Sequence, residues 1–337
     1  MKILLTGGAG YIGSHTAVEL IEAGHELVVI DNLSNSSVKS LRRVEAITQR
    51  DIVFHRVNLA DLSGVREVFS SESIDAVIHF AGLKSVNTSL RDPIRYYQNN
   101  VGSTLILLQV MAEFGVHKLV FSSSATVYGI PQELPVSETA GVGFGITSPY
   151  GRSKSMIEQI LTDASLAEPK LQIAILRYFN PIGAHVSGRI GEDPRNTPSN
   201  LLPYVSQVAI GLRKKVAVYG QQYPTTDGTG VRDYIHVVDL AHGHLRALDH
   251  LRSGVSTYNL GTGRGYSVLE VIEAFSRVSG RDIPLEIVAA RSGDVAMSFA
   301  DVEKAKRELA WVAERTLDDA CRDVWRWQLQ NPRGYDD

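Results

Sequence analysis

The sequence predicts an α/β fold in which a doubly wound parallel sheet is joined to a second, smaller α/β domain. Short apolar runs rich in Val and Ile alternate with amphipathic stretches over the first 180 residues. This alternation is typical of parallel strands with helices on both faces of the sheet. A glycine-rich turn follows the first apolar run, and after residue 180 long segments rich in Gly, Pro, Asn and Thr change the rhythm.

The individual elements follow from these patterns in chain order. In the first part we expect strands near residues 3–6, 27–30, 52–57, 76–80, 119–123 and 173–177, and helices near 12–23, 38–50, 62–70, 93–114 and 150–165. In the second part we expect helices near 201–212, 238–251, 268–278, 302–309 and 317–329. Loops as long as 181–203 and 220–232 are usually either functional or disordered in a compact domain. We therefore predict one domain over 1–180, with a return segment over 235–251, and another over 181–337.

The bulk composition excludes several classes of function. A net charge of −3 and a pI near 6.4 give no basis for binding nucleic acid or an anionic membrane. The single cysteine, Cys321, excludes an intramolecular disulfide and a metal site with several Cys ligands, and we expect no metal. The apolar runs are too short for a membrane span or an export signal, so we expect a cytoplasmic protein.

The first strand leads into a turn that predicts a dinucleotide site. Gly7, Gly10 and Gly13 precede a helical pattern, and this spacing allows a tight turn, close approach of a pyrophosphate and close packing of helix on strand. The helix N-terminus then offers free N–H groups to the phosphates. Asp31 ends the second strand, where a carboxylate accepts hydrogen bonds from ribose hydroxyls and repels a 2′-phosphate. The pattern predicts a Rossmann-type sheet that binds NAD rather than NADP.

The third and fourth strands also end at candidate cofactor contacts. Asn58 follows the third strand, where we expect a polar group that faces adenine. The fourth strand ends in the small residues Ala81 and Gly82, which let a cofactor approach the carboxyl end of the sheet. His79 lies inside this apolar strand, and we interpret it as a core histidine whose hydrogen bonds are satisfied.

A tyrosine and a lysine on a later helix predict proton transfer. Tyr150 and Lys154 are four residues apart and therefore share one helical face. A phenol with a pKa near 10 is a weak base at neutral pH, and nearby cationic groups stabilise the phenolate. Ser124 follows the strand near 119–123, where its hydroxyl is placed to share the proton of a substrate hydroxyl. Together with the nucleotide site, these residues predict an enzyme that moves a hydride and a proton.

These motifs, taken together, resemble the extended short-chain dehydrogenase/reductase family, and within it the enzymes that invert nucleotide-linked hexoses at C4. The resemblance covers essentially the whole chain and rests on ten motifs. They are Gly7-x-x-Gly10-x-x-Gly13, Asp31-Asn32-Leu33, His79-Phe80-Ala81-Gly82, Tyr150-x-x-x-Lys154 and the segments 122–129, 177–181, 198–201, 230–237, 258–261 and 331–335.

The resemblance implies an NAD-dependent isomerase that interconverts UDP-galactose and UDP-glucose. Tyr150 would take the proton of the sugar 4-hydroxyl while the C4 hydride passes to a tightly held NAD, and would return the proton after the 4-keto sugar has rotated. Ser124 would bridge the 4-oxygen, and Lys154 would tune Tyr150 and hold the nicotinamide ribose. The implied partner is a second copy of the chain, bound through the helices near 93–114 and 150–165.

The resemblance also implies the residues that contact each ligand. The cofactor contacts are Gly7, Gly10, Tyr11, Ile12, Gly13, Asp31, Asn32, Leu33, Ser34, Asn35, Ser36, Asn58, Leu59, Phe80, Ala81, Gly82, Leu83, Lys84, Asn99, Ser124, Tyr150, Lys154 and Phe179. The UDP-sugar contacts are Lys84, Ser124, Tyr150, Asn180, Asn200, Leu201, Ala217, Val218, Tyr219, Arg232, Ser298 and the run 291–294, which includes Arg291 and Asp294. Arg232 and Arg291 suit a diphosphate, because guanidinium pairs bidentately with phosphate oxygens.

The chain departs from the family pattern at two positions. Asn58 stands where the family usually has Asp, and its amide oxygen still accepts a hydrogen bond from the adenine amino group. Ser298 stands where enzymes of narrow specificity have a bulky Tyr, which leaves room beside the C2 substituent of the sugar. We therefore expect UDP-N-acetylglucosamine and UDP-N-acetylgalactosamine to be substrates as well.

Three other activities compete with this interpretation. A nucleotide-sugar 4,6-dehydratase would share NAD, Tyr150 and Lys154, but it needs an Asp-Glu pair where this chain has Ala125-Thr126, and elimination of water then lacks its general acid and base. A non-catalytic NAD sensor would not need the catalytic residues together. A net dehydrogenase would exchange its cofactor with an external oxidant or reductant.

Overall fold

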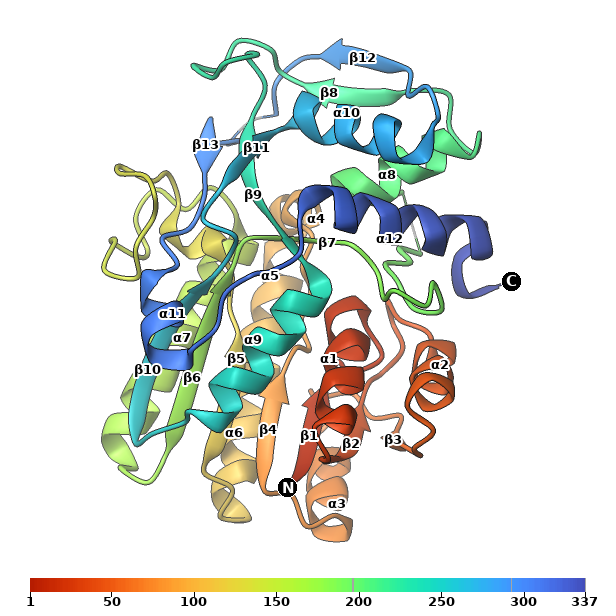
Figure 1. Cartoon of the computed structure of the whole chain (residues 1–337). Helices are drawn as coiled ribbons and strands as arrows, with labels where there is room; N and C mark the ends of the chain where they lie inside the picture. Colours follow the sequence, from red (N-terminus) through yellow and green to blue (C-terminus); the bar gives the residue numbers. More distant parts are fainter. Residues whose placement is uncertain (196, 292, 337) are drawn as a thin grey trace.

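A seven-stranded parallel sheet with helices on its faces forms the lower part of the molecule as drawn in Figure 1. The computed structural model describes residues 1–195, 197–291 and 293–336. The strand order is β10-β6-β5-β4-β1-β2-β3, which is doubly wound and confirms the predicted fold class. The strands are β1 (Lys2–Thr6), β2 (Glu26–Ile30), β3 (Val53–His55), β4 (Ala76–His79), β5 (Lys118–Ser122), β6 (Gln172–Tyr178) and β10 (Gly254–Leu260).

Alternating side chains of the strands build two separate cores, one on each face of the sheet. Along β1, Ile3 and Leu5 belong to one core and Leu4 to the other, as the two-residue period of a strand requires. The first core is completed by α1 (Tyr11–Glu22), α2 (Val38–Thr48) and α9 (Val237–Asp249). The second is completed by α3 (Leu62–Ser71), α6 (Ser103–Glu113) and α7 (Pro149–Ala167). Both faces of the sheet are therefore covered.

The chain returns to this sheet over a longer segment than expected. The helix expected within 235–251 is α9, which packs beside α1. The chain then continues into β10, which pairs in parallel with β6 from Gly254 to Leu260 and forms the edge of the sheet. This seventh strand was not predicted from the sequence.

The helix expected over 93–114 is interrupted. The structure has α5 (Pro93–Tyr96), a π-helical turn over Tyr97–Gly102 and then α6, and a short helix α4 (Val86–Arg91) precedes them. A π-turn inserts extra residues into the helical ladder and often lies at a functional site. Here the wide turn places the Asn100 side chain against the loop that follows β4.

The second half of the chain has a third core and two small sheets. This core lies among α8 (Leu201–Ala209), α10 (Val268–Ser279) and α12 (Leu317–Gln330). The parallel pair β8 (Val216–Tyr219) and β12 (Leu285–Val288) lies next to it (Figure 1). In the other sheet, β9 (Val231–His236) pairs with β7 (Asn180–Ile182), β11 (Gly265–Ser267) and β13 (Met297–Ser298). The remaining helix is α11 (Glu303–Leu309). In the described ranges, no helix is long and apolar enough to cross a membrane.

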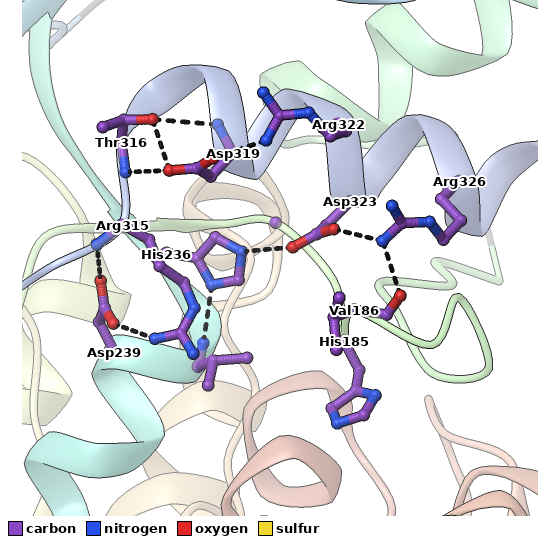
Figure 2. Close-up of polar contacts among 12 residues, drawn as sticks. His185, Val186, His236, Asp239, Arg315, Thr316, Asp319, Arg322, Asp323 and Arg326 are labelled. Atoms are coloured by element: carbon purple, nitrogen blue, oxygen red, sulfur yellow. Dashed lines mark hydrogen bonds and ion pairs between the residues drawn. The ribbon is translucent and has the colours of Figure 1, made fainter.

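Polar contacts attach α12 to its neighbours, as Figure 2 shows. Before the helix begins, Arg315 pairs with the buried carboxylate of Asp239 on α9. From the helix itself, Asp323 faces the His236 ring at 3.3 Å. One turn later, the Arg326 guanidinium donates to Asp323 Oδ1 at 2.8 Å and to the Val186 carbonyl at 2.6 Å. The last contact holds the loop that follows β7.

Candidate active site

The glycine turn after β1 is too tight for any other residue type at two positions. Gly7 has φ +71°, and a Cβ there would lie 2.8 Å from the Ala81 nitrogen. A Cβ on Gly13 would lie 2.6 Å from the Gly7 carbonyl oxygen, so the absence of a side chain lets α1 approach the turn. Gly10 is the N-cap of α1 and supplies no side-chain cap. The first N–H groups of α1 therefore stay available, and the turn fits a dinucleotide pyrophosphate.

Asp31 organises the loop after β2 through hydrogen bonds from both carboxylate oxygens. Its Oδ2 accepts from the Ala9 N–H at 3.1 Å, and its Oδ1 accepts from the Leu33 N–H and the Ser36 hydroxyl, both at 2.8 Å. Leu33 takes the left-handed conformation with φ +59° within this loop. The carboxylate thus joins the glycine turn to the segment 31–36, which contains the expected cofactor contacts Asn32, Leu33, Ser34, Asn35 and Ser36.

The loop after β4 is held by a residue that sequence reasoning missed. Asn100, in the π-turn, accepts from the Leu83 N–H at 2.8 Å and donates to the Leu83 carbonyl and to Ser153 Oγ, both at 3.0 Å. Its neighbour Asn99, the expected cofactor contact, donates to Asn100 Oδ1 at 3.0 Å. An Asn inside a helical pattern was the only signal for this contact.

His79 and Asn58, which lie at or after strands of the large sheet, form hydrogen bonds to other groups of the protein. His79 lies between Thr6 Oγ1 at 2.7 Å and Thr104 Oγ1 at 3.0 Å, which confirms it as a satisfied core histidine. Burial, together with the charge of Lys154, lowers the pKa of His79 to about 3. Leu59 is buried in the second core, while Asn58 Oδ1 accepts from the Ala60 N–H at 3.1 Å.

Tyr150, Lys154 and Ser124 are all buried near the carboxyl end of β5. Ser148 caps α7 by accepting from the Gly151 N–H at 3.2 Å, which places Tyr150 in the first helical turn. Lys154, one turn later, donates to the Ser122 carbonyl at 2.7 Å, and its Nζ lies 4.7 Å from the centre of the Phe121 ring. The structure therefore brings the three expected catalytic residues together around the end of one strand.

In the protein without a cofactor, the surroundings of Tyr150 raise the pKa of its phenol rather than lower it. Burial raises the pKa of Tyr150 to about 12, and a hydrogen bond with Ser124 opposes this shift. Burial also lowers the pKa of Lys154 to about 8, although the charge of Glu158 opposes this shift. The reason is that removing both groups from water disfavours their charged forms. An additional positive charge from a ligand is needed to favour the phenolate.

A buried ion pair between Arg177 and Glu158 lies next to Lys154 on α7 and supports the position of this helix. Glu158 lies one turn after Lys154 on α7, and its Oε2 accepts from Arg177 Nη2 at 2.6 Å. The Ser123 hydroxyl donates to the other oxygen of Glu158, and Arg177 also donates to Tyr128 Oη at 3.1 Å. This network connects β5, β6 and α7, and sequence reasoning did not identify it.

The expected UDP-sugar contacts come from loops and edge strands of the second half. Ser298 on β13 lies opposite Arg232 on β9 in the parallel register. The Arg291 guanidinium stacks over the Tyr219 ring at 3.7 Å, and the Asp294 N–H donates to the Arg291 carbonyl at 3.3 Å. Ala217 and Val218 lie on β8 before Tyr219, whereas Ser292, within the expected run 291–294, lies outside the described residues.

The remaining expected contacts lie between the two halves. Phe179 is buried after β6, and Asn180 is exposed at the start of β7. Lys84 and Asn200 both donate to one carboxylate oxygen of Glu192, at 3.0 and 2.7 Å, and Leu201 begins α8.

Tyr11 donates from its hydroxyl to the Gly183 carbonyl at 2.7 Å, which brings α1 to the loop after β7. Ile12 follows Tyr11 in the first turn of that helix.

Comparisons with known proteins agree with this geometry. Residues 3–261 match the NAD dependent epimerase/dehydratase family. The chain is 56% identical to a UDP-glucose 4-epimerase of Bacillus subtilis over 99% of both chains, and 54% identical to that of Mus musculus over 99% of this chain and 98% of the mouse protein.

Solved structures give the same result. A UDP-glucose 4-epimerase from Bifidobacterium longum, in complex with NAD+ and UDP, matches with a TM-score of 0.97 and 52% identity, covering 99% of this chain and 100% of that chain. The UDP-Glc/GlcNAc 4-epimerase of Campylobacter jejuni matches with a TM-score of 0.84 and 40% identity, covering 98% and 99%. The glycine turn, Asp31 and full-length similarity identify NAD as the cofactor. This chain belongs to the NAD dependent epimerase/dehydratase family, among its UDP-glucose 4-epimerases.

Proposed function

We propose that this enzyme interconverts UDP-galactose and UDP-glucose by inverting C4 of the sugar. The observation that carries the proposal is the placement of Tyr150, with Ser124 beside it, at the carboxyl end of the sheet. The glycine turn and the other expected cofactor contacts follow strands at the same edge, so a bound nucleotide is expected next to the phenol. Relatives named UDP-glucose 4-epimerase share more than half of the residues over the full length of the chain.

The residues of this chain have separate tasks in the reaction. Tyr150 Oη accepts the proton of the 4-hydroxyl as the C4–H bond breaks, and it returns that proton when the C–H bond reforms on the opposite face. Ser124 shares a hydrogen bond with the same oxygen, and the Lys154 ammonium stabilises negative charge on the phenol. Bound NAD supplies the acceptor, and then the donor, of the C4 hydride. Atoms and electrons balance within one turnover, because hydride and proton both leave and both return.

The residues after Ser124 favour epimerisation over dehydration. They form a 3-10 turn, Ala125–Tyr128. Its first two residues, Ala125 and Thr126, carry no carboxyl group. Thr126 Oγ1 donates to Ser124 Oγ at 3.0 Å, so it orients the serine. Elimination of water across C5 and C6 would need an acid and a base at these two positions.

The test of the function uses the purified protein without added NAD. Incubated with UDP-galactose, it is expected to form UDP-glucose while absorbance at the NADH wavelength stays constant after the first turnover. A dehydrated keto sugar would show the dehydratase instead. Accumulating NADH would show a net dehydrogenase, and NAD content without turnover would show a sensor.

Substrate range is expected to depend on Ser298, which lies on β13 opposite Arg232. A serine leaves room for the C2 acetamido group, so we propose that UDP-N-acetylglucosamine and UDP-N-acetylgalactosamine are interconverted too. Ser298→Tyr is expected to abolish turnover of the acetamido sugars while turnover of UDP-galactose stays within about threefold. The measurement is kcat/KM for both substrate pairs, and equal losses for both would contradict the proposal.

We further propose that the first part of the chain holds NAD and the second part holds the UDP-sugar, with 235–260 belonging to the first part. The glycine turn, Asp31 and the Phe80–Lys84 loop all follow strands of the large sheet. Arg232 and Ser298 lie on the small sheet, and Tyr219 ends the β8 strand. A structure of the complex with UDP would test this division by the residues that UDP contacts.

We propose a homodimer formed through α5, the π-turn, α6 and α7. Ile94, Leu105 and Met156 on these helices are exposed, although α7 packs against α5 and the π-turn. Exposed apolar side chains gathered on neighbouring helices suit a second copy of the same surface. Light scattering should give twice the chain mass of 36.9 kDa, whereas a mass of one chain would contradict the dimer.

A further inference from the structure

His244 is a fully buried histidine that has no role in the reaction proposed for Tyr150. It lies on α9, the helix that returns to the large sheet. Its Nδ1 is 2.8 Å from the Leu240 carbonyl oxygen, and its Nε2 is 3.0 Å from Ser122 Oγ, which is also fully buried. The two side chains are 122 residues apart in the sequence. The histidine therefore joins the return helix to the end of β5.

The two partners of the His244 ring determine which nitrogen carries the proton. A carbonyl oxygen only accepts, so Nδ1 donates to Leu240. Burial lowers the pKa of His244 to about 4, although the hydrogen bond to the Leu240 carbonyl opposes this shift. The ring is therefore neutral at pH 7, and Nε2 accepts from the Ser122 hydroxyl. Removal of the ring would take this acceptor away from a buried donor.

The His244 ring lies against residues at the ends of three neighbouring strands. Its centre is 4.8 Å from the centre of the Phe80 ring, which follows β4, and 6.1 Å from that of the Tyr178 ring, which ends β6. Ser122 ends β5, which lies between β4 and β6 in the sheet. Phe80 and Tyr178 are only half-buried, and Phe80 is an expected cofactor contact. One imidazole thus supports the edge of the sheet where NAD is expected.

Ser122 also provides the acceptor that holds Lys154. The Ser122 carbonyl accepts from Lys154 Nζ at 2.7 Å. Lys154 comes from α7 and His244 from α9, and these helices cover opposite faces of the sheet. The hydroxyl of Ser122 is thus held from one face, while its carbonyl holds the ammonium on the other. A shift of Ser122 would move the lysine that is expected to hold the nicotinamide ribose.

We propose that His244 is a positioning residue for the nicotinamide half of NAD. It acts through the Ser122 hydroxyl, which helps to fix the acceptor of Lys154, and through the Phe80 ring. It touches neither the sugar nor the reacting atoms. Its effect on turnover rests on the proposed function, whereas its effect on NAD does not, because the family itself is NAD dependent.

The test measures how fast bound NAD exchanges with added radiolabelled NAD in the holoenzyme. His244→Leu keeps an apolar side chain but removes the acceptor, so NAD exchange is expected to become about tenfold faster. At saturating NAD, kcat with UDP-galactose should fall about tenfold, whereas the Kd of UDP stays within about twofold. His244→Gln is expected to restore most of both losses, since its amide oxygen can accept from Ser122.

Ser122→Ala tests whether His244 acts through the serine. This variant lacks the donor and should show the same faster exchange, and adding His244→Leu to it should have no further effect. His250→Leu is the matched control. His250 caps the C-terminus of α9 and contacts the Arg246 carbonyl at the same 2.8 Å, so its loss should leave NAD exchange unchanged.

Three outcomes would overturn the inference. They are wild-type NAD exchange in His244→Leu, wild-type exchange in Ser122→Ala, and a smaller loss for His244→Leu than for His244→Gln, which would show that the ring only fills space. The Ser122→Ala result decides the matter even if His244→Leu does not fold. If the wild-type protein holds NAD but does not epimerise UDP-galactose, the proposed function fails, and NAD exchange still tests the role of His244.

Discussion

Tyr150→Phe is expected to lower kcat with UDP-galactose by about a thousandfold, the middle of the range for a lost general acid–base group. The substitution removes one oxygen from a buried side chain and leaves the ring to fill the same space. Ser124 and Lys154 remain, but neither group replaces a phenol as both acceptor and donor of the same proton. The affinity for UDP should stay within about threefold, because the phenol is expected to bond the sugar 4-hydroxyl, a group that UDP does not have. Initial rates and UDP titration measure the two effects.

Tyr266→Phe provides the control for Tyr150→Phe. Tyr266 lies on β11, where its ring is covered by the Arg264 guanidinium at 4.6 Å, so the loss of its hydroxyl should leave kcat unchanged. If Tyr150→Phe retains a tenth of the wild-type rate, another group is the base and the assignment is wrong.

Arg177→Met is expected to lower the free energy of unfolding by about 3–5 kcal/mol, the cost of leaving a buried charge without its partner. The side chains of Arg177 and Glu158 are 8% and 7% exposed, and their closest atoms are 2.6 Å apart. Without the guanidinium, the Glu158 carboxylate keeps only weaker donors such as the Ser123 hydroxyl. Urea unfolding followed by circular dichroism gives the change in free energy.

A surface ion pair of the same length gives the comparison. Arg277 and Asp318 are also 2.6 Å apart, but their side chains are 57% and 43% exposed. Arg277→Met should therefore cost less than about 1 kcal/mol. Equal losses for the two variants would show that burial does not set the strength of the Arg177 pair.

The parts of the site that follow directly from local sequence were predictable. The glycine turn and Asp31 are adjacent to apolar strand patterns. Tyr150 and Lys154 are four residues apart, so they lie on one helical face. These features depend on the geometry of a single strand, turn or helix. The sequence predicted the fold class but not the order of the strands in the sheet. Paired strands are far apart in the chain, and local patterns do not show which strands pair.

The missed residues act through contacts between distant segments. Asn100 bonds Leu83 across 17 residues, and Lys84 meets Glu192 across 108. The hydrophobic periodicity of the sequence does not indicate contacts between residues that are so far apart. The i,i+4 spacing of Tyr150 and Lys154 shows that a cation is nearby, but it gives no measure of how far burial removes the phenol from water and raises its pKa.

The position of β10 bears on the order in which the molecule can be completed during synthesis. The ribosome releases the first six strands of the sheet well before residues 254–260 emerge. The edge of β6 therefore stays unpaired while β7, α8, β8 and β9 are made. Until then, β6 presents unpaired N–H and C=O groups, which favour association with other chains. A nascent chain shortened before β10 would contain every expected catalytic residue and would still have β6, rather than β10, as the edge strand of the sheet. The large sheet is thus completed only after the chain has left it, built part of the second half and returned.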